Sequence, residues 1–119
     1  MRLRILLLVT IALAAGAAGR AQAQGAQWTA AETFFSQGET FYLSSKFDEA
    51  ASSFKKAYES RPMPQFLYNV AAAYHMKGKK ASEAEAYDKA VDYYGRYLTE
   101  NKDAKDREQV ENARRLEAQ

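Results

Sequence analysis

Apolar residues recur at steps of three and four over residues 29–60, and this spacing predicts two amphipathic helices. The apolar face of the first helix carries Phe34, Gly38 and Phe41. The second helix, after a turn at residues 44–46, has the apolar stripe Phe47, Ala50, Phe54, Ala57 and Tyr58. Pro62 and Pro64 are expected to end it, because the residue before a proline is driven out of the helical region.

The same period continues over residues 64–100 and predicts two more helices. The third has the stripe Leu67, Val70, Ala71 and Tyr74, and Gly78 is expected to cap its C-terminus. Ser82 and Glu85 have the spacing of a capping box, so the fourth helix is expected to open at Ser82. Its stripe contains Tyr87, Ala90, Val91, Tyr94, Tyr97 and Leu98. No window alternates strictly between apolar and polar residues, so the fold class is all-α.

A fifth, polar helix is expected over residues 103–118. Its apolar stripe is thin and consists of Ala104, Val110, Ala113 and Leu116. Two favourable i,i+4 ion pairs are expected on its surface, Asp103 with Arg107 and Glu111 with Arg115. A helix with one weakly apolar side and one charged side is suited to cover the end of a core.

The first 23 residues have the three parts of a secretory signal peptide. Two arginines precede an apolar run, which small residues and the sequence Ala21-Gln22-Ala23 follow. The apolar run is shorter than the roughly 20 residues of a membrane-spanning helix, which disfavours a retained anchor. The alanine-rich run is typical of bacterial export, so we expect cleavage after about Ala23 and a periplasmic or secreted protein. Residues 24–28 are then a flexible N-terminal remnant, and residues 29–119 form one domain.

Removal of this segment changes the charge of the chain. Three arginines lie within residues 1–23, so the mature chain would have 14 basic and 15 acidic residues and a net charge of −1. A near-neutral surface gives no electrostatic reason to expect nucleic acid or an anionic membrane as partner. The chain has no cysteine and a single histidine, His75, so neither a disulfide nor a metal site is expected. No nucleophile elbow, glycine-rich phosphate loop or catalytic histidine arrangement is apparent, so we expect neither a cofactor nor an enzyme.

Residues 31–63 and 64–100 are similar to one another at a shift of 33 residues: the spacing of Phe34, Gly38 and Phe41 recurs in Leu67, Ala71 and Tyr74. The first unit resembles a tetratricopeptide repeat of an exported bacterial protein. It fills the family's register with Phe34, Gly38, Phe41, Ala50, Phe54, Ala57 and Pro62. It departs from that register at Gln37, where an apolar residue is usual, and at Ser45, where the turn usually has glycine.

The second unit matches the family pattern well in its first helix and only through Ala90 and Tyr94 in its second. Seven extra residues, near 79–85, lengthen either the connection or the helices. Tyr97 stands where the family has a small alanine. The resemblance implies a short right-handed solenoid of two helical hairpins plus a C-terminal capping helix.

In this family the first helix of each repeat lines a concave groove that binds peptides or partner helices. Carried over by position, the groove residues are Phe35, Glu39, Tyr42, Tyr68, Asn69, Ala72, His75 and Met76. Asn69 lies where an asparagine of the family often forms hydrogen bonds with the backbone of an extended peptide. The alternative is that Asn69 bonds a neighbouring carbonyl. Tyr94 and Tyr97 are expected in the core, Tyr93 could face a partner, and the Lys55-Lys56 pair is expected on a solvated face.

The sequence thus predicts an exported protein–protein interaction module that binds a peptide or helix of an envelope protein. The alternative is a self-associating structural component of the cell envelope. Repeat units bury one face against their neighbours, and about three are usually needed for a stable array. Two units could therefore complete their core by forming a homo-oligomer.

Overall fold

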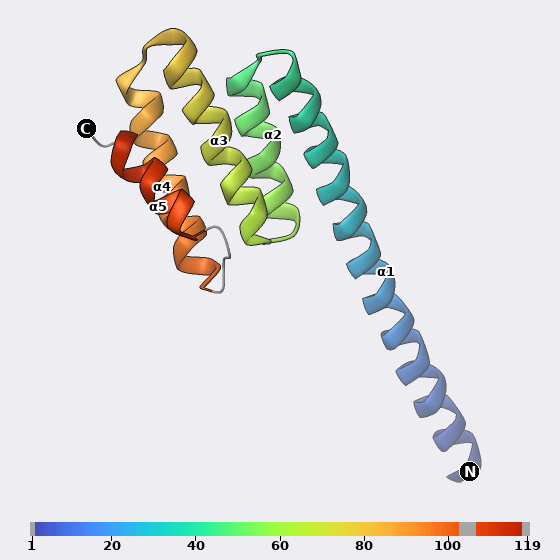
Figure 1. Cartoon of the computed structure of the whole chain (residues 1–119). Helices are drawn as coiled ribbons and strands as arrows, with labels where there is room; N and C mark the ends of the chain where they lie inside the picture. Colours follow the sequence, from blue (N-terminus) through green and yellow to red (C-terminus); the bar gives the residue numbers. More distant parts are fainter. Residues whose placement is uncertain (1, 103–106, 118–119) are drawn as a thin grey trace.

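The computed structural model describes residues 2–102 and 107–117, and it describes side chains for residues 19–102 and 107–115. This part of the chain consists of helices joined by turns. Its helices are α1 (Arg2–Leu43), α2 (Phe47–Ser60), α3 (Pro64–Ala81), α4 (Ala84–Glu100) and α5 (Arg107–Glu117). Each helix packs mainly against its neighbour in the sequence, and short turns reverse the chain between the first four (Figure 1). The all-α prediction is confirmed, and the arrangement is that of a helical repeat.

The turn between α1 and α2 is stabilised by backbone hydrogen bonds to the last turn of α1. The amide of Lys46 donates to the carbonyl of Phe41 at 2.8 Å, and Ser45 adopts φ 60°, in the left-handed region. A glycine would take this conformation without the steric cost that a Cβ atom adds. At the other end of α2, Pro64 is the first residue of α3, where its missing N–H costs nothing.

The expected boundary between the third and fourth helices is wrong. α3 continues past Gly78 to Ala81, and Ser82, rather than Gly78, takes the left-handed conformation, with φ 54°. α4 begins only at Ala84, after Glu83, and Ser82 makes no capping box with Glu85. Gly78 has a different role, because a Cβ at this position would lie 2.9 Å from the ring of Tyr87 in α4. It lets the two helices approach closely.

The seven extra residues of the second unit lengthen both of its helices. Measured from matching positions of the first unit, four of them lie before Ser82 and three between Ser82 and Ala90. Each group is about one helical turn of roughly 3.6 residues. One turn added to each arm of the hairpin would leave the facing positions below it in register, and Ala90 and Tyr94 are indeed buried, as Ala50 and Phe54 are in the first unit.

The core lies between the helices of the two hairpins, and Leu67 and Val70 are its most completely buried large side chains. Tyr94 and Tyr97 are buried in it, as predicted. α1 and α2 pack closely at Gly38, where an added Cβ would lie 2.5 Å from the Phe54 ring. Gly38 therefore leaves the space that Phe54 fills.

α5 packs against α4 and contributes Val110 to the core. Arg107 caps the end of α4, because its guanidinium donates to the backbone carbonyls of Leu98 at 2.7 Å and Asn101 at 3.3 Å. The expected surface pairs differ. Glu111 pairs with Arg107 at 3.6 Å, whereas Arg115 bonds the Asn112 side chain. Asp103 lies outside the described residues, as do the expected ends of this helix.

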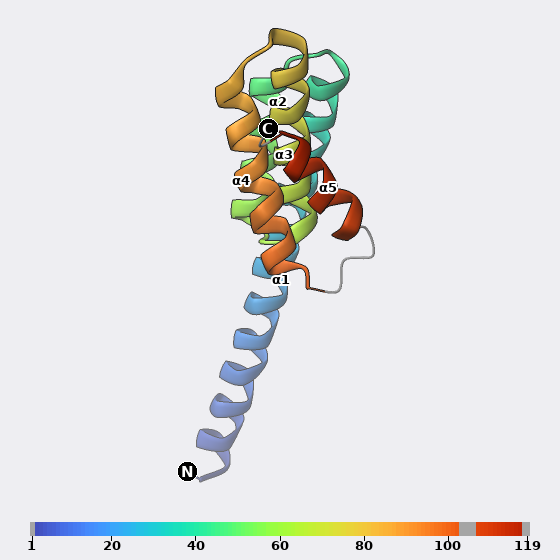
Figure 2. The ribbon, with the colours of Figure 1, turned by 60° about the vertical axis from the view of Figure 1, so that its left-hand side comes forward.

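The N-terminal part of α1 extends as a single helix away from the other helices (Figures 1 and 2). Residues 24–28, expected as a flexible remnant, form an exposed part of this helix. Cleavage after Ala23 would place them at its free end. The last of these residues, Trp28, packs on α2's C-terminal neighbour Arg61, whose guanidinium lies 3.3 Å from the centre of the Trp28 ring. Over the residues that the structure describes, none of the helices is both long and apolar enough to cross a membrane.

Candidate binding groove

A cavity of about 500 Å³ is lined by residues of α1, α2 and α3. This size is typical of a binding site for a small ligand or a few peptide side chains. We call it the groove. It is lined by Phe35, Glu39, Tyr42, Leu43, Phe54, Tyr68, Asn69 and Ala72.

The groove owes its position to the helical period of α1. Phe35, Glu39 and Leu43 follow one another at steps of four, so they share one face of the helix. Phe35 connects the three walls, since its ring lies 5.7 Å from the rings of both Phe54 in α2 and Phe66 in α3. These tilted contacts hold Phe35 in place and leave its remaining surface toward the cavity.

Apolar surface is exposed at the groove to an unusual degree. Among the residues whose side chains are described, only three large apolar side chains are exposed. Two of them, Leu43 at 84% and Tyr68 at 38%, line the groove. Tyr68 is held by edge-on contacts with Tyr94 and Tyr97 at 5.7 and 5.4 Å. Exposed apolar side chains that gather around a hollow mark a binding surface more often than isolated ones do.

Two polar side chains, Glu39 of α1 and Asn69 of α3, stand among this largely apolar lining. Within the described part of the chain, neither makes a side-chain hydrogen bond or an ion pair. The alternative in which Asn69 bonds a neighbouring carbonyl therefore finds no support there. The carboxylate of Glu39 and the amide of Asn69 remain available to a ligand, with acceptors on both and donors on Asn69.

The structure brings together six of the eight residues expected at the groove. His75 and Met76 lie further along α3 and do not line it. His75 turns toward α4 instead, where its Nδ1 is 3.1 Å from the hydroxyl of Tyr94 and its ring packs near Tyr87. Burial lowers the pKa of His75, and the positive charge of Lys79 lowers it further. His75 is therefore neutral in the folded protein over a wider range of pH than a free histidine.

Two lining residues, Leu43 and Phe54, are missing from the expected set. Leu43 follows the same four-residue spacing as Phe35 and Glu39, a signal that could have identified it. Phe54 was expected only in the core, and it is indeed buried. Its ring reaches the groove because Gly38 lets it pass beneath α1, which depends on the distance between two helices.

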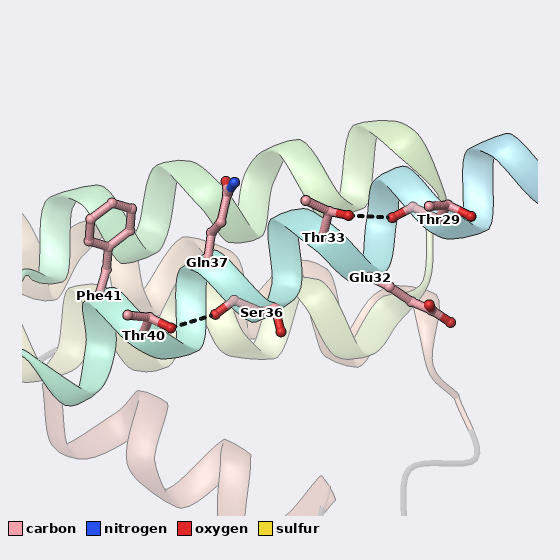
Figure 3. A pocket seen from close by; sticks show the side chains of 7 residues that line it. All are labelled: Thr29, Glu32, Thr33, Ser36, Gln37, Thr40 and Phe41. Carbon is pink, nitrogen blue, oxygen red and sulfur yellow. Dashed lines mark hydrogen bonds between the residues drawn. The ribbon is translucent and has the colours of Figure 1, made fainter.

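A second hollow, of about 530 Å³, lies on α1 and is much less suited to binding. All of its lining residues belong to α1: Thr29, Glu32, Thr33, Ser36, Gln37, Thr40 and Phe41 (Figure 3). The hydroxyls of Thr33 and Thr40 already donate to carbonyls one turn earlier, at 2.8 and 3.1 Å. Gln37 is exposed here, on the outer side of the first helix. A polar residue in place of an apolar one is appropriate where no earlier repeat packs.

The lysine pair on α2 is less uniformly solvated than expected. Lys56 is exposed, but Lys55 is half-buried and its Nζ donates to the Tyr74 hydroxyl at 2.5 Å. Lys55 also lies 4.9 and 5.4 Å from the ring centres of Tyr74 and Tyr93. Burial acts to lower the pKa of Lys55, but the hydrogen bond to Tyr74 and the nearby phenol oxygens outweigh it and raise the pKa. Tyr93 is thus half-buried in a cation–π cluster that shares no residue with the groove.

Comparison with known proteins adds no further identification, since no protein-family model matches the chain and no curated protein matches it significantly. Among the described residues, no three His, Cys, Asp or Glu side chains gather as a metal site would require.

Proposed function

We propose that this chain is an exported protein-interaction module of the tetratricopeptide-repeat type, which binds a peptide or helix of an envelope protein in the groove and catalyses no reaction. In this proposal the two hairpins form a short right-handed solenoid, and α5 is its capping helix. The supporting observation is the groove itself: an aromatic cavity with exposed Leu43 and Tyr68 and with two polar side chains, Glu39 and Asn69, that have no partner among the described residues. Apolar contact would supply affinity, and Asn69 would set the register of a bound peptide backbone.

The alternative, a self-associating structural component, receives less support. Its simplest form stacks further copies on the ends of the array, so it needs apolar end faces. The hollow on the outer side of α1 is lined by four hydroxyls, one amide, one carboxylate and a single large apolar residue, Phe41, and three of the hydroxyls are already bonded within the helix. At the other end, α5 covers α4 and buries Val110. Both ends therefore resemble closed ends, and light scattering should give the mass of a monomer.

Site-specific photo-crosslinking tests the groove directly. A photoreactive amino acid at Ala72, in the groove, should capture a defined envelope protein in intact cells, whereas the same group at exposed Ser52 on α2 should not. Tyr68→Ala should reduce the crosslinking yield, because the lost contact area weakens the free energy of binding by about 2 kcal/mol. Asn69→Ala should weaken it by about 1–3 kcal/mol, because polar groups of the ligand would lose their partner. Both variants should keep the helical circular dichroism of the wild type.

Lys55 is unsuitable as a neutral control for these variants because it packs on two tyrosines. Glu59→Gln, on the exposed part of α2, is a better one. A partner that binds equally well to the Tyr68/Asn69 double variant would exclude the groove. Export is tested separately by mass spectrometry, which should find Gln24, within a few residues, at the N-terminus of the mature protein. Intact Met1 in a membrane fraction would contradict the signal peptide.

A further inference from the structure

The charge of the groove is one-sided. Glu39 is the only Asp, Glu, Lys or Arg among the lining residues, and within the described part of the chain nothing neutralises it. Lys77 is the first lysine after the groove residues of α3. It does not line the groove, and its ammonium group is paired with Asp48 at 2.9 Å and with Glu83 at 3.2 Å. A ligand that fills the groove thus meets apolar rings and one uncompensated negative charge.

The spacing along α1 limits how such a ligand can be arranged. Phe35 and Glu39 are one step of four apart, which is about 6 Å along a helix axis. In an extended peptide, side chains two positions apart point the same way and are separated by roughly 6.6 Å. One side chain could then lie on the aromatic rings while the second meets the carboxylate.

Asn69 favours an extended ligand over a helical one. An extended peptide has backbone N–H and C=O groups free to bond the side-chain amide, which offers one acceptor and two donors. Inside a helix, the backbone groups are already bonded to one another. The free amide of Asn69 would then have no backbone partner.

We propose, on the basis of the binding function argued above, that the groove selects extended segments in which a large apolar residue and a lysine or arginine lie two positions apart. The apolar side chain packs against Phe35, Phe54 and Tyr68, and the cation pairs with Glu39. Acidic segments and free C-terminal carboxylates are disfavoured, because no lining residue carries a positive charge.

The test is an NMR titration of the ¹⁵N-labelled protein with three acetylated and amidated pentapeptides. Their sequences are Gly-Phe-Ser-Lys-Gly, Gly-Phe-Ser-Gln-Gly and Gly-Phe-Ser-Glu-Gly, and a fourth peptide, Gly-Ala-Ser-Lys-Gly, tests the apolar residue. Shifts of the Asn69 side-chain amide and of the α1 amides around Glu39 report binding in the groove. We expect the lysine peptide to bind about threefold more tightly than the glutamine peptide and about tenfold more tightly than the glutamate peptide, with the preference reduced by salt. Of the two lysine-containing peptides, the one with alanine should bind more weakly than the one with phenylalanine.

Variants separate the charge from the cavity. Glu39→Gln should remove the ranking of the three phenylalanine peptides, and Glu39→Lys should reverse it, whereas Glu59→Gln should leave it unchanged. Equal affinities for the three peptides in the wild type, or a ranking that survives Glu39→Gln, would overturn the charge selectivity while leaving groove binding in place. If no phenylalanine peptide shifts the groove resonances, both this inference and the proposed binding site are wrong.

Discussion

Replacement of Gly38 by alanine should destabilise the domain even though it adds a single methyl group. The new Cβ would lie 2.5, 2.6 and 3.0 Å from three carbons of the Phe54 ring. That ring is buried and packs against Phe35, so it can relieve the overlap only by shifting toward the groove, which it lines. Overpacking of this kind typically costs about 1–3 kcal/mol. Alanine also favours a helix over glycine by about 1 kcal/mol, which offsets part of the cost. We expect a net loss of about 1 kcal/mol, and Gly38→Leu should unfold the domain or leave it molten.

Gly95→Ala is the matched control. It makes the same chemical change in α4, but the added Cβ would be 3.5 Å or more from Arg114, an ordinary contact. This variant should gain up to about 1 kcal/mol from helix propensity alone. Thermal melts followed by circular dichroism should therefore separate the two variants by roughly 10 °C, because 1 kcal/mol corresponds to about 4–8 °C in a domain of this size. A Gly38→Ala variant that melts at or above the melting temperature of Gly95→Ala would refute the close contact. So would a Gly38→Ala substitution that destabilises the Phe54→Leu variant as much as it destabilises the wild type.

Three further predictions concern stability. Ser45→Gly should raise the free energy of unfolding by about 0.5–1 kcal/mol in urea titrations, because φ is 60° there, whereas Ser44→Gly should not. Lys55→Glu should lower it by about 1 kcal/mol or more, since it removes contacts with two tyrosines. Lys56→Glu should lower it less, because the exposed Lys56 makes one longer ring contact among the described residues, 5.8 Å from the centre of the Phe34 ring; equal effects would contradict the cation–π cluster. Because the folded state lowers the pKa of His75, unfolding binds a proton below about pH 6.5, so stability should fall from pH 7.5 to 5.5 and His75→Gln should reduce that fall.

Much of the fold could be predicted because helix-forming patterns are local. The period of the apolar positions located all four helices of the two hairpins, and Pro62 and Pro64 marked the junction between the second and third. The end of α3 could not be located in this way. Gly78 is acceptable either as a helix cap or as a point of close helix contact, and the sequence does not separate these uses. The ring of Tyr87, which packs over Gly78, decides in favour of the second.

The sequence by itself determined which residues face inward and which residues of α1 share a face with Phe35, because both follow from the 3.6-residue period of a helix. Only the tertiary structure decided which of these residues meet. Phe54 lines the groove because Gly38 allows it beneath α1, and His75 leaves the groove because Tyr94 lies across from it on α4. The physical reason is that periodicity fixes directions around one helix axis, whereas a binding surface depends on distances between axes. Those distances are set by side chains packed from separate parts of the chain.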